Sequence, residues 1–243
     1  MKDFISRLTF GFLMAQFVPG AIAVSSIAFL YAAFTLKTDN SMWAIIDTAS
    51  ARWGAIWLSK LFFVAACTGA GMLIHGTHWA VLGYLETHPC PLTSSEHGSQ
   101  RVYESFWHSF PVIIQIVLGP PKILLEILCF LFLGTKIREL ATQENVPEID
   151  KDKMEAFNFL QDFYLHFAQF FAHTSYALMI SLLSLVTFVH FFGLSTTRIW
   201  ILITIYLFTG FFFVIGRIQL ATLFEAEHEL VVESARMKTE VED

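Results

Sequence analysis

Long stretches without a single charged residue constrain this chain more than any other feature of its sequence. Four such stretches follow one another along the 243 residues. About 20 apolar residues in an α-helix cross the ~30 Å hydrocarbon core of a bilayer, because each residue advances the helix by about 1.5 Å. We therefore expect four membrane-spanning helices, at about residues 8–36, 56–85, 163–192 and 199–216.

The shortage of charge also excludes other classes of protein. The chain has 15 basic and 21 acidic residues, so only 15% of it is charged, and its mean hydropathy is +0.58. Soluble domains carry about a quarter charged residues. The net charge of −6 also argues against nucleic acid as a partner. The composition predicts an all-α, multi-pass integral membrane protein whose solvent is the lipid bilayer.

A fifth apolar segment, residues 105–135, is interrupted at its centre by Gly119, Pro120, Pro121 and Lys122. Each half is too short to cross a bilayer alone, and two successive prolines remove two hydrogen bonds of a helix. We interpret it as either one broken span or a pair of half-helices that enter and leave on the same side. Non-helical backbone at membrane depth needs protein or water around it.

The loop at 136–155 and the C-terminal end are expected on the cytoplasmic side. Basic residues favour that side, and both four and five spans place these two segments there. We divide the chain into a membrane domain, residues 1–216, and an acidic tail, residues 217–243, expected to form a short helical extension. The tail offers a docking helix for a soluble partner or a solvated helical end. A chain of this length is expected to form a homo-oligomer or join a membrane complex.

One polar row follows the third charge-free stretch with helical spacing. Its members are separated by four, three, four and three residues, which keeps them on one face of a helix. Ionisable residues inside a membrane are costly, so such a row is expected to face protein or water. The row consists of Asp162, His166, Gln169, His173 and Tyr176.

Shorter polar patterns lie on two other segments. Gly71, His75 and His78 share a face of the second span, where the glycine would let another helix approach closely. In the interrupted segment Glu126 lies four residues after Lys122, which predicts an intramembrane ion pair if the helix resumes at Pro121. With four spans, the histidines of the second and third spans and Lys122 gather toward the cytoplasmic end, so we favour that arrangement.

These residues support three hypotheses of function. The first is a channel or transporter that moves protons, ions or a small solute along a path lined by Asp162, His166, Gln169, His173, His75, His78, Lys122 and Glu126. The second is an electron-transfer anchor that binds haem or a metal through His75, His78, His166 and His173. The third is a non-catalytic membrane subunit or effector that recruits a partner through its tail. No enzyme motif is found, and the cofactor stays open.

Overall fold

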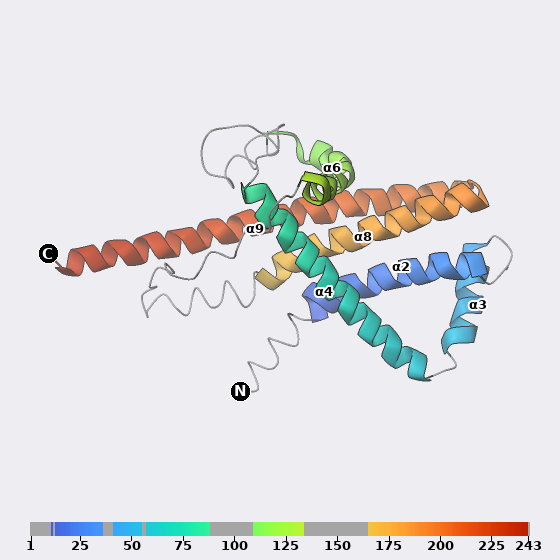
Figure 1. Cartoon of the computed structure of the whole chain (residues 1–243). Helices are drawn as coiled ribbons and strands as arrows, with labels where there is room; N and C mark the ends of the chain where they lie inside the picture. The colour runs from blue at the N-terminus through green and yellow to red at the C-terminus, as the bar shows by residue number, and fades with distance from the viewer. Residues whose placement is uncertain are drawn as a thin grey trace.

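The computed structural model describes residues 11, 13–35, 41–54, 57–87, 109–133 and 165–242. Within these ranges all regular secondary structure is helical, and no strand is found (Figure 1). The elements in chain order are η1 (Leu13–Phe17, a π-helical turn), α2 (Val18–Thr35), α3 (Met42–Gly54), α4 (Trp57–Thr87), α6 (Val112–Leu133), α8 (Leu165–Phe192) and α9 (Thr196–Glu242).

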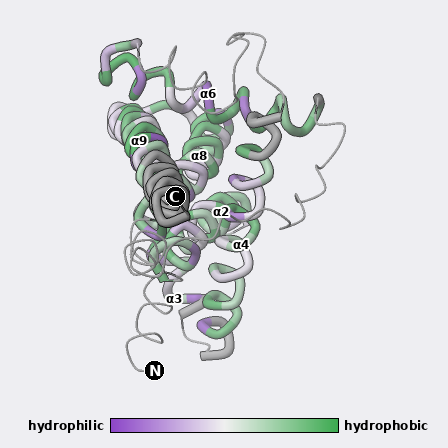
Figure 2. Tube along the Cα trace, turned by 90° about the vertical axis from the view of Figure 1, so that its left-hand side faces the viewer, coloured by the Kyte–Doolittle hydropathy of each residue, from purple (hydrophilic) through white to green (hydrophobic). Residues whose placement is uncertain are grey.

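Five of these helices are long and apolar enough to cross a membrane. Their apolar parts are Leu13–Thr35, Lys60–Leu82, Val112–Phe132, Leu165–Phe192 and Thr196–Leu223. Large apolar side chains cover their outer faces, with Leu73 74% and Phe132 80% exposed, and hydrophobic residues follow the helices in Figure 2. Such surfaces are too apolar for water. The all-helical fold expected from the sequence is therefore confirmed for the described residues, and the five apolar helices are consistent with a multi-pass membrane protein. The expected count of four spans plus a broken segment is not confirmed.

The interrupted segment differs from the expectation, because α6 continues through Pro120 and Pro121 as one helix. A proline removes the hydrogen bond to the carbonyl four residues earlier, here those of Ile116 and Val117. Helix α9 covers both. The Tyr206 hydroxyl donates to the Val117 carbonyl oxygen at 2.6 Å. The Ile116 carbonyl lies directly against the backbone of Gly210, where no Cβ would fit.

Pro19, near the start of α2, likewise frees a carbonyl that a neighbouring helix meets. A regular α-helix would pair its missing amide hydrogen with the Ala15 carbonyl oxygen, which instead accepts a hydrogen bond from His173 of α8. The backbone just before Pro19 forms the π-helical turn η1. In each case the freed carbonyl of a membrane helix is met by a neighbouring helix.

Two glycine crossings set the arrangement of the helices. Gly20 of α2 lies against the Cys67 carbonyl of α4, and Gly71 of α4 lies against the Gln16 carbonyl, which confirms the close approach predicted at Gly71. Gly119 of α6 meets Gly210 of α9 in the same manner. In Figure 1 α6 is seen almost end-on while α8 and α9 run across the page. Helix α6 therefore crosses the α8–α9 hairpin rather than running beside it.

Helices α8 and α9 form an antiparallel hairpin, with α2 packed along α8 (Figure 1). Gly193 closes the turn between them with a φ of 84°, a left-handed conformation that glycine adopts without strain. Helix α9 passes Gly216 without interruption and continues to Glu242, so the expected helical tail is an extension of the last apolar helix. Helix α3 was not expected from the sequence. It has only 13 residues, which is too short to cross a bilayer, and it carries charges at Asp47 and Arg52.

Candidate functional site

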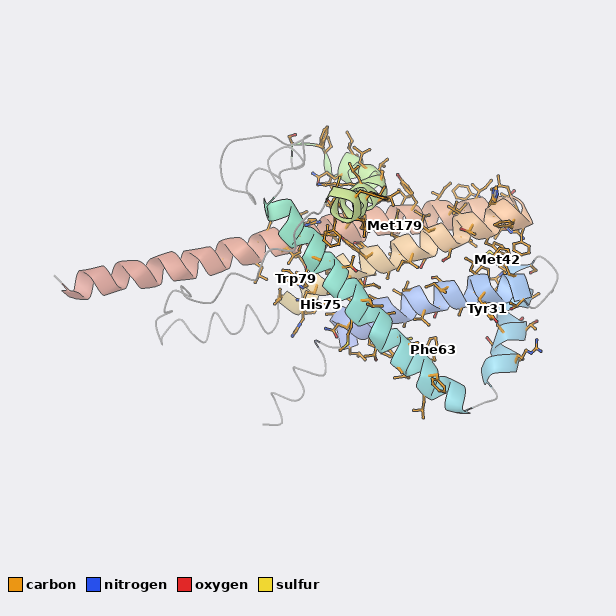
Figure 3. All side chains as sticks on the ribbon, viewed as in Figure 1. Tyr31, Met42, Phe63, His75, Trp79 and Met179 are labelled. Carbon is orange, nitrogen blue, oxygen red and sulfur yellow. The ribbon has the colours of Figure 1, made fainter. Side chains whose placement is uncertain are left out.

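Three imidazole rings meet where α4 and α8 face each other. His75 and His78 come from α4, and both lie edge-to-face against His173 of α8, at ring-centroid distances of 5.1 and 5.2 Å. Tyr176, one turn further along α8, packs against His78 at 5.4 Å. His78 and His173 are completely buried. The position of His75 and Trp79 on this part of α4 is seen in Figure 3.

The spacing of the side chains explains why the two helices bring these rings together. The i, i+3 pair on α4 and the i, i+3 pair on α8 each lie on one helical face. The close approach of α4 to the start of the α2 segment, at Gly71, then holds α4 within reach of α8. His75 lies one turn beyond this glycine on the same face. The geometry therefore follows from a helical repeat and one small residue.

His173 has one ring nitrogen whose role is settled by its partner. Its Nδ1 is 2.5 Å from the Ala15 carbonyl oxygen. A carbonyl only accepts hydrogen bonds, so Nδ1 carries the hydrogen and Nε2 is the basic nitrogen of the neutral ring. Nε2 is buried and has no hydrogen-bond partner. His173 thus joins α8 to the start of α2 through one nitrogen and offers an acceptor through the other.

Several other polar atoms of this cluster are buried without a hydrogen bond. They are both ring nitrogens of His78, Nδ1 of His75 and the hydroxyl of Tyr176. Buried polar groups are nearly always paired, because each orphaned group in an apolar medium costs about 1–3 kcal/mol or more. A cluster of four side chains that are all incompletely paired is therefore costly as a purely structural device. It is better suited to groups that exchange protons.

A buried ion pair lies close to the histidines. Arg217 of α9 donates from Nη2 to the Glu126 carboxylate of α6 at 2.7 Å, and the two side chains are 12% and 5% exposed. The Arg217 guanidinium and the Lys122 ammonium both lie over the Phe213 ring, at 5.1 and 5.7 Å from its centroid. The other carboxylate oxygen of Glu126 is buried without a hydrogen bond.

The ion pair and the histidine cluster form one electrostatic unit. Arg217 lies near enough to His78, and Glu126 and Arg217 near enough to Tyr176, for their charges to interact through the protein interior. The unit combines four helices: α4 and α8 supply the rings, α6 the carboxylate and α9 the guanidinium. Charges in a low-dielectric interior interact over longer distances than in water. A proton gained or lost at one of these groups therefore changes the electrostatic energy of the charged forms of the others.

Arg217 is the member of this cluster that sequence reasoning missed. The spacing along the chain suggested Lys122 as a partner of Glu126, and the structure shows that Arg217 of α9 pairs with Glu126. Arg217 directly follows the fourth charge-free stretch, so it was assigned to the tail. The signal that could have located it is the uninterrupted helical pattern of α9, in which the apolar part extends to Leu223. That extension places Arg217 inside the last apolar helix.

The remaining members of the predicted polar row have different surroundings. Gln169 is buried on the same face of α8 as His173. The His166 ring packs directly against Gly11, where no Cβ would fit. Among the described residues, no ring contact is found between His166 and the other histidines. Asp162 lies outside the described residues. The structure thus brings together His75, His78, His173, Tyr176, Glu126 and Arg217, with Lys122 at the edge.

Among the described residues, no group of three or more His, Cys, Asp or Glu side chains is arranged to hold a metal ion. A haem held by two axial histidines has one on each face of the porphyrin, whereas the rings of His75 and His78 each touch that of His173.

No family model matches the chain, and no curated protein and no solved structure matches it either.

Proposed function

We propose that the protein moves protons across its membrane through the cluster formed by His75, His78, His173 and Tyr176 and the adjoining Glu126–Arg217 pair. The observation that carries the proposal is that the rings of His75 and His78 both contact that of His173, and that both nitrogens of His78, Nδ1 of His75 and Nε2 of His173 are buried without a hydrogen-bond partner. Histidine is the side chain whose charge changes near neutral pH. Ionisable groups within membrane helices are costly and commonly mark proton and ion pathways.

The geometry favours protons over larger ions. The rings pack directly against one another, and the described residues leave no wide pore between them. A hard cation such as Ca²⁺ or Mg²⁺ would need several oxygen ligands around it, whereas imidazole nitrogens and one carboxylate are present here. A proton needs only a chain of groups that each accept and donate, and His78 can receive a proton at either ring nitrogen.

The face of α8 continues this polar lining in both directions. Gln169 lies one turn before His173, and buried serine hydroxyls lie beyond Tyr176 at Ser181 and Ser184. The Ser181 hydroxyl is 2.6 Å from that of Ser26 of α2. Polar side chains therefore follow the buried face of α8 for most of its length, as a path across the membrane requires.

Proton flux into liposomes tests the proposal. The full chain is reconstituted with a pH-sensitive dye inside, and a potassium diffusion potential is applied. We expect acidification to be faster than in empty liposomes and to be lost in His78→Ala. The matched control is His190→Ala, because His190 lies on the exposed side of α8 far along the same helix; its flux should equal that of the unmodified protein.

Either of two results would overturn the proposal. One is flux in the unmodified protein no faster than in empty liposomes. The other is equal flux in His78→Ala and the unmodified protein, with both shown to be folded by their size-exclusion profiles. An absorption spectrum and a metal analysis of the same purified sample address the electron-transfer alternative, which predicts a Soret band or bound metal.

The length of α9 favours a second candidate, a membrane subunit that recruits a soluble partner. The apolar part of α9 ends at Leu223, and the helix continues to Glu242. Figure 1 shows it projecting beyond the other helices. A chain shortened after residue 225 should keep the proton flux and lose any co-purifying partner. Co-purification that survives the deletion contradicts this role for the tail.

A further inference from the structure

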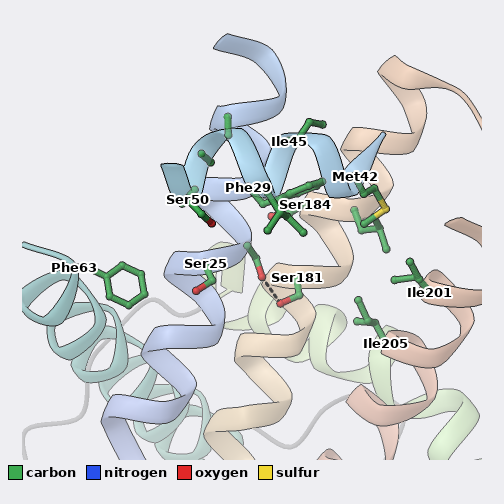
Figure 4. A pocket seen from close by; sticks show the side chains of 16 residues that line it. Ser25, Phe29, Met42, Ile45, Ser50, Phe63, Ser181, Ser184, Ile201 and Ile205 are labelled. Carbon is green, nitrogen blue, oxygen red and sulfur yellow. Dashed lines mark hydrogen bonds between the residues drawn. The ribbon is translucent and has the colours of Figure 1, made fainter. Parts of the chain in front are cut away.

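A cavity lies away from the histidines, among α2, α3, α8 and α9. Its volume is about 490 Å³, which falls within the roughly 300–1,000 Å³ of small-molecule pockets. Side chains from these four helices, together with Phe63 of α4, surround it on several sides (Figure 4). None of its lining residues belongs to the histidine cluster or to the Glu126–Arg217 pair, so it is a separate site.

Small side chains on two helix faces leave the room for this cavity. On α2 the lining residues Ser25, Ala28 and Ala32 follow one another at helical spacing, which keeps them on one face. Helix α8 contributes Ser181 and Ser184 at the same spacing. Residues of this size let helices pack closely but fill little volume themselves, so the space between the faces stays open.

The wall of the cavity is uncharged. Among the described residues that line it there is no acidic, basic or histidine side chain, and residues such as Phe29, Ile45 and Leu185 form its apolar part. Transfer of a charged group into such surroundings without a partner is strongly unfavourable. The chemistry of the wall therefore selects a neutral ligand.

The cavity opens on the side where α3 and α4 approach each other. Two of its lining residues, Ile46 of α3 and Phe63 of α4, are 40% and 42% exposed. Phe63 belongs to the apolar, membrane-crossing part of α4. Because both side chains at this mouth are apolar, a molecule dissolved in the bilayer can enter here without passing through water.

Serine hydroxyls supply the polar atoms of the wall, and they differ in their partners. Those of Ser26 and Ser181 lie 2.6 Å apart, as Figure 4 shows, and each is also within hydrogen-bond distance of a carbonyl of its own helix. For the hydroxyl of Ser184, which is only 7% exposed, no hydrogen-bond partner is found among the described residues. Ser25 and Ser50, both exposed, also lack one there.

The unpaired hydroxyls lie at two ends of the cavity. Ser184 is buried inside the bundle, whereas Ser25 and Ser50 lie on the same side as Phe63 in Figure 4, toward the mouth. An unpaired hydroxyl in an apolar wall is costly. A ligand with oxygen acceptors at both of its ends would complete these pairings, and the acyl chain of a bilayer lipid would not.

We propose that this cavity binds the ring of a lipid-soluble quinone. One ring carbonyl oxygen accepts a hydrogen bond from Ser184 inside the cavity, and the other faces Ser25 and Ser50 at its mouth. A carbonyl oxygen only accepts and a serine hydroxyl can donate, so the ring matches donors at both ends without introducing a charge or a further donor. The hydrocarbon chain of the quinone leaves past Ile46 and Phe63 into the bilayer.

Photolabelling of the full chain in phosphatidylcholine nanodiscs tests this proposal. The probe is a benzoquinone whose saturated side chain carries a diazirine, and mass spectrometry identifies the labelled peptides. We expect adducts on α3 around Ile46 and on α4 around Phe63, where the side chain leaves the cavity.

Competition separates the ring oxygens from the hydrocarbon. The unlabelled quinone should compete for the labelling. The alkylbenzene with the same side chain lacks both oxygens and should compete less well by roughly tenfold, because Ser184 then has no acceptor. Cholesterol, which is neutral but has a single hydroxyl and no carbonyl, should also compete less well by roughly tenfold.

Two pairs of variants locate the site. Ala49→Phe fills the cavity and should reduce labelling about tenfold; Ala51→Phe, on the exposed side of the same helix, is its matched control and should label normally. Ser184→Ala should weaken competition by the quinone roughly tenfold and leave that by the alkylbenzene unchanged. Its control is Thr187→Ala, which removes a hydroxyl of α8 outside the cavity. Thermal unfolding verifies that each variant is folded.

Several outcomes would overturn the proposal. Labelling spread evenly over exposed residues such as Leu73 and Phe132 would show only annular lipid. Equal labelling of Ala49→Phe and Ala51→Phe would place the probe elsewhere. Equal competition by the quinone and the alkylbenzene, or by the quinone and cholesterol, would show that the ring carbonyls are not recognised, and so would an unchanged Ser184→Ala. None of these results depends on proton flux, so the quinone site and the proposed proton path fail or stand separately.

Discussion

The two halves of α8 pack in different ways, the first through buried polar side chains and the second through aromatic rings. The first half buries Gln169, His173 and Tyr176 against α4 and the start of α2. The second half packs Phe188 against Phe29 and Phe192, with ring centroids 5.1 and 4.8 Å apart, beside an apolar cavity.

The difference shows where the cost of the fold lies. Aromatic rings pack by shape complementarity alone, and lipid chains can take their place without an electrostatic penalty. Buried imidazoles and an ion pair lose their hydration and are incompletely paired here. A chain has no packing reason to accept that cost when apolar residues of equal size would fill the same space. The polar half is therefore where function is expected, and the aromatic half is where stability is expected.

Glu126→Ala should give the largest loss of stability. The substitution leaves Arg217 buried without its carboxylate, and breaking a buried pair in this way costs about 3–5 kcal/mol. Equilibrium unfolding in mixed detergent micelles measures the loss. The double variant Glu126→Ala with Arg217→Ala should recover part of it, because no uncompensated charge remains. A double variant as unstable as the sum of its parts would show that the two residues act independently.

Phe188→Ala should cost less, although the side chain is larger and fully buried. It removes two ring contacts worth about 0.5–1.5 kcal/mol each beyond burial, and the burial itself contributes little here because lipid chains are as apolar as the protein interior. The same unfolding titration measures it, with proton flux as the second readout. Flux should persist in the folded fraction. If Phe188→Ala abolishes flux while the protein stays folded, the division of α8 into a functional and a structural half is wrong.

Ser181→Ala, at the boundary between the two halves, should have the smallest effect. It removes the hydrogen bond to Ser26 across α2 and α8. Interhelical hydrogen bonds of this kind contribute about 0.6 kcal/mol on average inside membranes. A loss above about 2 kcal/mol in the unfolding titration would contradict this, and would extend the costly polar region beyond Tyr176.

Several features of the site could be predicted from the sequence because they depend on spacing along one helix. The faces carrying Gln169, His173 and Tyr176, and those carrying His75 and His78, follow directly from the helical repeat. The close approach at Gly71 follows from the absence of a side chain. Pairings between helices could not be predicted in this way. Glu126 had Lys122 one turn away on its own helix, yet its partner Arg217 is supplied by α9.

The continuity of α6 teaches the same lesson for the backbone. Two successive prolines predicted a break, because the sequence shows which hydrogen bonds are lost and not what replaces them. Tyr206 and Gly210, far along the chain, meet the two carbonyls that the prolines leave unpaired.

The sequence alone was enough to predict the helical class, the apolar character of the long helices and the face on which each polar group lies, because these depend on hydropathy and on a repeat of 3.6 residues. Only the tertiary structure decided that α6 stays whole, that Arg217 is the partner of Glu126, and that the histidines of α4 and α8 touch. These are contacts between distant segments, and their energies depend on distances that no local pattern contains.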